Sequence, residues 1–195
     1  SGEVRLEQKP VLLSRLLKET SGVLDMQARE CGITLNIVNE AAEHDHLIGS
    51  PVHLGQVLQN IIGNAIKYNN DSGTVDVTCR EISYDGNTAG LEFVCADTGI
   101  GMSEEFQQHA FEPFAQENES ARTSYAGTGL GLPITKELVE QMGGSISFKS
   151  APGEGTEFRI VIPFVIDTEE KPDEAALDKP DDLEMVNGAK ILVVE

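Results

Sequence analysis

Three stretches of the chain place apolar residues at helical spacing. The clearest lies within residues 50–68, where apolar positions recur three or four apart, at Leu54, Val57, Leu58, Ile61, Ile62, Ala65 and Ile66. This spacing predicts an amphipathic helix with one buried face, capped by Ser50 and with Pro51 as its first residue. We also expect helices over 10–31, with Pro10 near the first turn, and over 133–142, ended by Gly143 and Gly144.

Other stretches alternate apolar and polar residues, which is the spacing of β-strands. They predict a short strand over 3–7, a strand over 32–38, and a hairpin formed by 74–82 and 91–97. A second hairpin is expected from 145–150 and 156–164, with a glycine-rich turn between them. Residues 103–126 are polar and irregular, so we expect a long segment without regular structure there.

Residues 3–164 are therefore expected to form one compact domain. Residues 1–2, Ser-Gly, resemble the remnant of an affinity tag. Beyond residue 164 the composition changes, because residues 167–184 hold nine acidic residues and two lysines, with prolines and no periodicity. This composition predicts a disordered acidic linker over 165–188. Residues 189–195 end the chain with the apolar pattern of a buried strand, which we interpret as the first strand of a further domain.

Charge and composition limit the possible partners and the compartment. The formal net charge of −19 argues against a nucleic-acid partner, since most of the surface would repel phosphates. The three cysteines have no close pairing and no metal-ligand spacing, which is typical of a reducing, cytoplasmic compartment. No apolar stretch reaches the roughly 20 residues that cross a bilayer, so we expect no membrane contact by this chain.

The polar side of the predicted helix over 50–68 carries a stripe of possible ligands. Gln56, Asn60, Asn64 and Lys67 recur at spacings of four, four and three, which aligns them on one face. The stripe is either a solvated face or a row of groups that faces a cleft. In the second case an amide oxygen could ligate Mg²⁺, and the ammonium group could neutralise phosphate charge.

Two glycine-containing segments are further candidates for a binding site. Asp97 ends an apolar strand and is followed by Gly99 and Gly101, which suits either a strand-ending turn or a carboxylate that accepts a hydrogen bond from an exocyclic amine. The run GTGLGL at 127–132 lacks the dinucleotide-binding spacing and precedes a helix. Its amides and the helix N-terminus could hold a phosphate chain, and a flexible hinge is the other interpretation.

The order of these segments resembles the N, G1, F and G2 boxes of the catalytic ATP-binding domain of sensor histidine kinases. An asparagine-bearing helix, D-x-G-x-G after a strand, FEPF at 111–114 and GTGLGL before a helix follow one another, with GEGTEF at 153–158 near the end. The resemblance covers residues 3–164. It implies an α+β fold of the Bergerat type, a two-layer α/β sandwich whose mixed sheet is covered on one face by helices, with a mobile ATP lid over about residues 103–126.

The resemblance also implies roles for the helix stripe and the carboxylate. Asn64 would ligate a Mg²⁺ ion that bridges the phosphates, and Asn60 would line the same site. Lys67 and Tyr68 would lie beside the phosphates and the ribose, and Asp97 would accept a hydrogen bond from the adenine amine. The implied ligands of the protein are therefore ATP and Mg²⁺.

Further residues are assigned to nucleotide binding by the same resemblance. Gly99 and Gly101 would let the base approach closely, and Thr156 would support the adenine end directly or through a water. Arg122 is a candidate contact for the γ-phosphate. The glycines expected to shape the phosphate end of the lid are Gly127, Gly129 and Gly131, and the neighbours assigned with them are Ile100, Thr128, Leu130 and Leu132.

The implied activity is transfer of the ATP γ-phosphoryl group to a histidine on a separate dimerisation and phosphoacceptor domain, with Asn60, Asn64 and Lys67 as catalytic residues. Gyrase-like relatives place a glutamate general base where this chain has Asn60, so slow ATP hydrolysis is expected. None of the histidines, His44, His46, His53 and His109, has the helix context of a phosphoacceptor. We therefore do not expect this chain to phosphorylate itself on histidine.

The last residues extend this interpretation to a second partner. KILVVE at 190–195 resembles the start of a response-regulator receiver domain, which implies a hybrid kinase that passes phosphate to a receiver domain or response regulator. The parent protein could be anchored in a membrane. Two other functions remain open at this point, a nucleotide-binding module without phosphotransfer and a gyrase-type ATPase.

Overall fold

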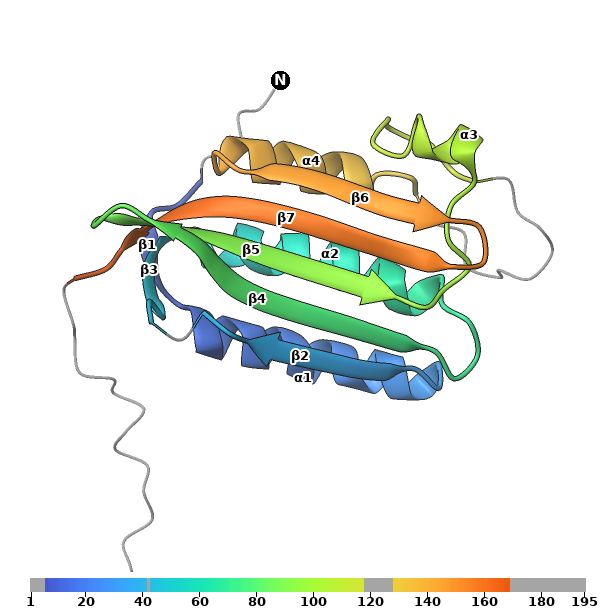
Figure 1. Ribbon diagram of the computed structural model, residues 1–195, viewed down its shortest axis with the longest axis horizontal. Helices are drawn as coiled ribbons and strands as arrows, with labels where there is room; N and C mark the ends of the chain where they lie inside the picture. Colours follow the sequence, from blue (N-terminus) through green and yellow to red (C-terminus); the bar gives the residue numbers. More distant parts are fainter. Residues whose placement is uncertain (1–5, 42, 118–127, 169–195) are drawn as a thin grey trace, which may run out of the picture.

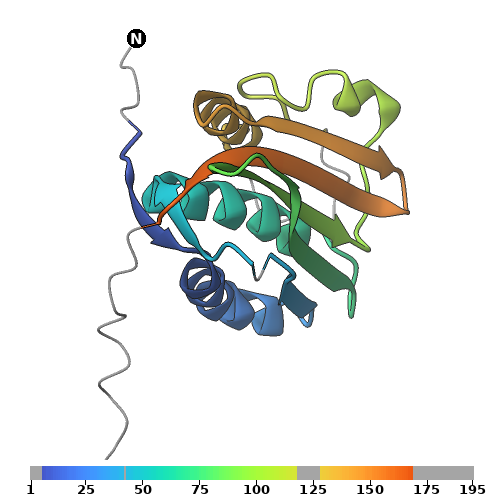
Figure 2. The same cartoon turned by 60° about the vertical axis from the view of Figure 1, so that its left-hand side comes forward.

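A mixed seven-stranded sheet with helices on one face makes up the described part of the chain (Figures 1 and 2). The computed structural model describes residues 6–41, 43–117 and 128–168. No helix in these ranges has the length and apolar character that crossing a bilayer requires. The helices are α1 (Leu13–Glu30), α2 (Pro51–Lys67), α3 (Glu104–Gln107) and α4 (Gly131–Gln141). The strands are β1 (Lys9–Leu12), β2 (Thr34–Asn39), β3 (His46–Gly49), β4 (Thr74–Tyr84), β5 (Thr88–Asp97), β6 (Ser145–Ala151) and β7 (Gly155–Ile166).

The strand order is β1-β3-β7-β5-β4-β2, and β6 pairs with β7. The β2–β4 pair is parallel and the other pairs are antiparallel, so the sheet is mixed. The two expected hairpins are β4–β5 and β6–β7, and the strand expected over 32–38 is β2. Figure 2 shows the three long helices, α1, α2 and α4, gathered on one side of the sheet. The expected two-layer sandwich with one covered face is confirmed.

The alternation of side chains explains why helices cover only one face. On β4, Val75, Val77 and Cys79 are buried, whereas Asp76 and Arg80, at alternate positions, are exposed. A strand points successive side chains to opposite faces, so the apolar set meets the helices and the polar set meets solvent. All seven apolar residues that predicted the helix over 50–68 are buried in α2.

The cysteines of the sheet are core residues. Cys79 and Cys95 are buried, and Cys31 is exposed. Burial raises the pKa of the Cys79 thiol to about 12, and it also raises the pKa of Cys95. Both thiols are therefore protonated near neutral pH and act as small apolar side chains.

The N-terminal part of the chain differs from the sequence-based expectation. Residues 6 and 7 of the strand expected over 3–7 are not in a strand, and residues 3–5 lie outside the described ranges. The helix does not begin at Pro10, because Lys9–Leu12 forms β1. This strand pairs antiparallel with β3, with Val11 opposite Leu47. The prediction was wrong because β3, which the sequence analysis missed, supplies the partner.

Helix α1 is capped by a residue that is distant in sequence. Its N-cap residue, Leu12, makes no side-chain capping bond. Instead the amide N–H of Ser14 donates to Asp45 Oδ1 at 2.7 Å, and the Ser14 hydroxyl donates to Asp45 Oδ2 at 2.5 Å. The N–H of Leu13 donates to the Asp45 carbonyl at 2.9 Å. The loop before β3 thus satisfies the free amides that a local cap usually satisfies.

Ser50 precedes α2 as expected, but its side chain does not cap the helix backbone. The residue occupies the N-cap position without a side-chain capping bond. Its hydroxyl lies 2.6 Å from Nδ1 of His53, and the residue is buried. The expected position is therefore confirmed. The expected capping role is wrong because the Ser50 hydroxyl forms a hydrogen bond with the His53 imidazole instead.

Two predicted boundaries need adjustment. The stretch expected to be irregular contains the short helix α3, whose first turn is capped by the Ser103 hydroxyl, an acceptor for the Phe106 N–H at 3.2 Å. Of the lid expected over 103–126, residues 118–126 lie outside the described ranges, as do residues 169–195. Strand β7 continues to Ile166, which pairs with Leu47, so the folded unit extends past residue 164.

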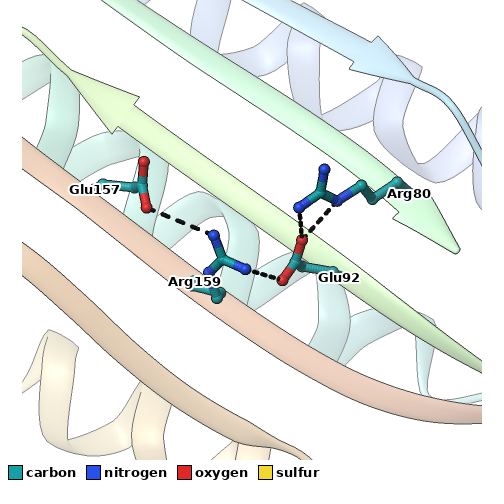
Figure 3. Close-up of polar contacts among 4 residues, drawn as sticks. All are labelled: Arg80, Glu92, Glu157 and Arg159. Atoms are coloured by element: carbon teal, nitrogen blue, oxygen red, sulfur yellow. Dashed lines mark hydrogen bonds and ion pairs between the residues drawn. The ribbon is translucent and has the colours of Figure 1, made fainter. Parts of the chain in front are cut away.

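The face of the sheet without helices carries a buried carboxylate between two arginines (Figure 3). Glu92 on β5 accepts a hydrogen bond from Arg80 Nε at 2.6 Å and another from Arg159 Nη1 at 2.6 Å. Its side chain is 4% exposed, whereas the arginine side chains are 48% and 42% exposed. The arginine side chains thus shield a carboxylate on the solvent-facing side of β5.

Replacing both Arg80 and Arg159 by methionine should destabilise the domain, because Glu92 would remain buried without a cation. We expect a loss of about 2–3 kcal/mol in the free energy of unfolding, measured by urea denaturation. As the control, adding Glu92→Met to the double variant should restore much of the loss, since an apolar set often replaces a buried ionic group without cost. A double variant as stable as the wild type would contradict this role of the arginines.

Candidate functional site

Asp97, Thr156, Lys67 and Tyr68, four of the predicted site residues, lie at one end of the molecule, where several elements meet. Figure 1 shows the tip of β5, the turn between β6 and β7, and the end of α2 on its right-hand side. Asp97 is the last residue of β5, and Lys67 is the last residue of α2. The hydrogen bonds described below join these ends, so residues far apart in sequence form one site.

Asp97 is held by two backbone amides. The N–H of Gly99 donates to Asp97 Oδ1 at 2.8 Å, and the N–H of Thr156 donates to the same oxygen at 3.1 Å. Burial raises the pKa of this carboxyl, and the two amide hydrogen bonds act in the opposite direction. Within the described part of the chain both bonds use Oδ1, which leaves Oδ2 available as an acceptor.

Thr156, expected at the adenine end, lies beside Asp97 on the neighbouring strand. Besides its amide bond to Asp97, its hydroxyl lies 2.8 Å from the hydroxyl of Ser150. Ser150 also donates to the Gly155 carbonyl at 3.0 Å and accepts from the Met102 N–H at 2.9 Å. The Ser150 hydroxyl therefore connects β6, β7 and the segment after Gly101.

The glycines after Asp97 are needed for packing within the protein. A Cβ at Gly99 would overlap the carbonyl oxygen of Tyr68, and one at Gly101 would overlap that of Ala151. Gly101 also has a φ of +67°, which disfavours other residues. The resemblance to histidine kinases implied that these glycines let the base approach closely. The structure provides another reason, the close contact of two backbones at each position.

The end of α2 is joined to the segment after β5. The N–H of Ile100 donates to the Tyr68 carbonyl at 3.0 Å, and the Ile100 side chain is exposed. Lys67 places its ammonium nitrogen 4.7 Å from the centre of the Tyr68 ring, a cation–π contact. Lys67 and Tyr68 therefore lie directly beside the Asp97 segment, as the predicted site requires.

Asn60 and Asn64 lie one turn apart on α2, and both are partly buried. The amide group of Asn60 donates from Nδ2 to Thr135 Oγ1 on α4 at 3.2 Å. The described residues contain no cluster of three or more His, Cys, Asp or Glu that could hold a metal. A Mg²⁺ ion here would therefore rely on carboxamide oxygens and on oxygens of its ligand or water, a donor set that suits this ion.

The glycine-rich run leads into α4. Gly129 has a φ of +67°, and a Cβ there would come within 2.8 Å of the Phe114 backbone, whose N–H donates to the Gly129 carbonyl at 3.0 Å. Leu130 is the N-cap residue of α4 and makes no side-chain capping bond, and Pro133 has no N–H, so among the described residues the amides of Gly131 and Leu132 remain available to an anion. Gly131 begins the helix, two residues earlier than expected.

Not every predicted site residue can be placed. Thr128, Leu130 and Leu132 lie in or next to the first turn of α4. Gly127 and Arg122 lie outside the described residues. A surface hollow of about 540 Å³ lies among residues 103–117 and is lined by residues such as Phe106, His109 and Phe114. None of the predicted site residues lines this hollow, so the candidate site rests on the contacts around Asp97 and α2.

Three residues of the site were missed by the sequence analysis. Thr135 and Ser150 bind other site residues through their hydroxyls, and Gly155 approaches Asp97 so closely that a Cβ would overlap the Asp97 carbonyl oxygen. One signal was present for Thr135, because a polar residue precedes Leu138 and Val139 at helical spacing on the buried face of α4. The roles of Ser150 and Gly155 depend on contacts between strands, which local patterns do not reveal.

The pKa of Asp97 leads to a prediction about stability and pH. A raised pKa in the folded state means that Asp97 favours folding below the pKa of the unfolded chain, about 3.9, and that this contribution is lost as the pH rises through the higher folded value. Asp97→Asn keeps an oxygen for the two amides and removes the charge. Without nucleotide, the variant should be more stable than the wild type at pH 7, and the difference should disappear in acid. Urea denaturation across this pH range measures it, and a variant less stable at pH 7 would contradict the prediction.

Two bacterial signalling proteins are similar to this chain in sequence. The chain is 35% identical over 158 residues to the signal transduction histidine-protein kinase BarA of Escherichia coli K12, covering 81% of this chain and 17% of BarA. It is 43% identical over 136 residues to the virulence sensor protein BvgS of Bordetella bronchiseptica RB50, covering 69% of this chain and 11% of BvgS. The chain thus spans less than a fifth of the length of these relatives.

Solved structures and a family model agree with this result. The crystal structure of full-length ShkA in complex with AMPPNP is similar with a TM-score of 0.72 and 29% identity, over 86% of this chain and 33% of ShkA. The mycobacterial sensor histidine kinase MprB is similar with a TM-score of 0.63 and 25% identity, over 82% of this chain and 99% of that chain. Residues 49–166 of the 195 match a family model. The protein therefore belongs to the family of histidine kinase-, DNA gyrase B- and HSP90-like ATPases.

Proposed function

We propose that this chain is the ATP-binding catalytic domain of a sensor histidine kinase, which transfers the γ-phosphoryl group of ATP to a histidine on another domain. The observation that carries the proposal is the hydrogen-bonding pattern of the Asp97 carboxylate. Its Oδ1 accepts two backbone N–H groups, while Oδ2 is left as an acceptor for an amine such as that of adenine. The names of the relatives BarA and MprB support the kinase class, and the AMPPNP complex of ShkA supports nucleotide binding.

The phosphate end of the nucleotide would lie between α2 and the first turn of α4. Asn64 would supply a carboxamide oxygen for a Mg²⁺ ion, with Asn60 lining the same site, and the amides of Gly131 and Leu132 in the first turn of α4 would meet phosphate oxygens. Lys67, on the same side of α2, would add one positive charge. When bound, the metal ion would neutralise phosphate charge. These groups orient the triphosphate and offset the repulsion expected from a chain of net charge −19.

Transfer to an imidazole does not require a base in this domain, because the attacking nitrogen of a neutral imidazole has a lone pair and carries no proton. The site has an amide at Asn60, which cannot accept a proton from water, so it is suited to transfer rather than to hydrolysis. Positioning and charge neutralisation would then supply most of the catalysis. We further propose that the acceptor histidine and a receiver domain belong to the longer protein, in which the catalytic domain extends to the end of β7 at Ile166 and the acidic residues after it form a linker.

Incubating the chain with labelled ATP, Mg²⁺ and a separately prepared phosphoacceptor domain tests the proposal. We expect label on the acceptor histidine, no label on this chain, and slow release of free phosphate. Tight nucleotide binding without labelled histidine would instead support a binding module without transfer activity. Steady phosphate release by the chain alone would support a gyrase-type ATPase.

Asn64→Ala should weaken Mg²⁺-dependent binding of a non-hydrolysable ATP analogue by at least about tenfold, equivalent to about 1.4 kcal/mol. The reason is that the variant loses a carboxamide oxygen while the partly exposed position tolerates the smaller side chain. Gln56→Ala is the matched control, since Gln56 lies on the same stripe of α2 but is exposed. Calorimetry with and without Mg²⁺ gives both affinities. Equal affinities of the Asn64 and Gln56 variants would show that the metal site is assigned wrongly.

A further inference from the structure

Thr135 on α4 is buried, with 0% of its surface exposed, and its hydroxyl group takes part in two hydrogen bonds. Its Oγ1 donates to the carbonyl of Gly131, four residues earlier on the same helix, at 2.8 Å. The same oxygen accepts a hydrogen bond from Asn60 Nδ2 on α2 at 3.2 Å. The proposed function assigns no role to Thr135, yet this residue connects the first turn of α4 to a side chain of the proposed metal site.

The direction of these hydrogen bonds is fixed by the chemistry of the groups. A hydroxyl has one proton, and here the Gly131 carbonyl, which can only accept, takes it. Towards Asn60, the Thr135 oxygen can then act only as an acceptor, so the side chain of Asn60 must present its NH₂ group. Because the NH₂ group of Asn60 donates to Thr135, the carboxamide oxygen of Asn60 is the atom that can accept a hydrogen bond or ligate a cation.

We propose that Thr135 is a positioning residue, which holds the carboxamide of Asn60 so that Oδ1 is the atom available to the Mg²⁺–triphosphate ligand. This inference rests on the proposed function. It also makes the orientation of Asn60 depend on the first turn of α4, which begins at Gly131 within the glycine-rich run. Without the Thr135 oxygen the amide could rotate and present its NH₂ group, a donor that cannot ligate a cation.

Variants of Thr135 test the proposal through nucleotide binding measured by calorimetry, with a non-hydrolysable ATP analogue and with or without Mg²⁺. Thr135→Val keeps the shape of the side chain and removes the oxygen. We expect it to weaken Mg²⁺-dependent binding by about tenfold, in the range typical for residues that orient a metal ligand. Thr135→Ser keeps the hydroxyl and should bind like the wild type. Wild-type affinity in Thr135→Val would overturn the proposal.

A double-variant comparison separates positioning from simple stabilisation. Because Thr135 acts through Asn60, Thr135→Val should weaken binding by less than about twofold when Asn60→Ala is already present. A full additional loss in that background would overturn the proposal. Thr20→Val, at another buried threonine, on α1, is the matched control and should change thermal stability without changing the effect of Mg²⁺.

A measurement on the wild-type protein keeps the test valid even if Thr135→Val fails to fold. The side-chain amide protons of Asn60 should exchange with water more slowly than those of the exposed Gln56 in an NMR experiment without nucleotide. Equally fast exchange would overturn the positioning role. If instead the wild type shows protected Asn60 protons but binds no nucleotide with Mg²⁺, the proposed function fails, and the ligand assigned to the Asn60 oxygen fails with it.

Discussion

The close approach of backbone segments around the end of β5 is the constraint on which the site depends. Gly99 packs against the Tyr68 carbonyl, Gly101 against that of Ala151, and Gly155 against that of Asp97. A side chain at any of these positions would separate the segments, since even a Cβ would overlap a backbone oxygen. Because the segments meet without side chains between them, amides from two different segments reach a single carboxylate oxygen of Asp97.

This packing also explains how a carboxylate can be kept in a partly buried position. Burial disfavours its charged form and raises its pKa, and the amides of Gly99 and Thr156 recover part of the cost. Glu92 is another buried carboxylate of the sheet, and its hydrogen-bond donors are two arginines in place of backbone amides. Both Glu92 oxygens thus have protein donors, whereas within the described part of the chain Asp97 Oδ2 receives no hydrogen bond. The difference favours a structural role for Glu92 and a binding role for Asp97.

The two helices of the proposed phosphate site are linked by side chains as well as by apolar packing. Asn60 bonds to Thr135, and Thr135 bonds to Gly131 at the start of α4. Gly129, two residues earlier, is joined to Phe114 by a backbone hydrogen bond. These contacts form a continuous path from α2 to Phe114, a described residue of the predicted lid. Thr135 thus connects the start of α4 to the amide of Asn60.

The sequence by itself determined the elements whose signals are local. Apolar spacing located α2 and its polar stripe, alternation located both hairpins and β2, and the order of short motifs indicated the nucleotide site. Only the tertiary structure decided the pairing of β1 with β3, the capping of α1 by Asp45, and the roles of Thr135 and Gly155. Each of these depends on residues that are distant in sequence, up to 75 positions apart for Asn60 and Thr135. Local periodicity indicates which face of a helix or strand is buried, but it does not indicate which distant residue packs against that face.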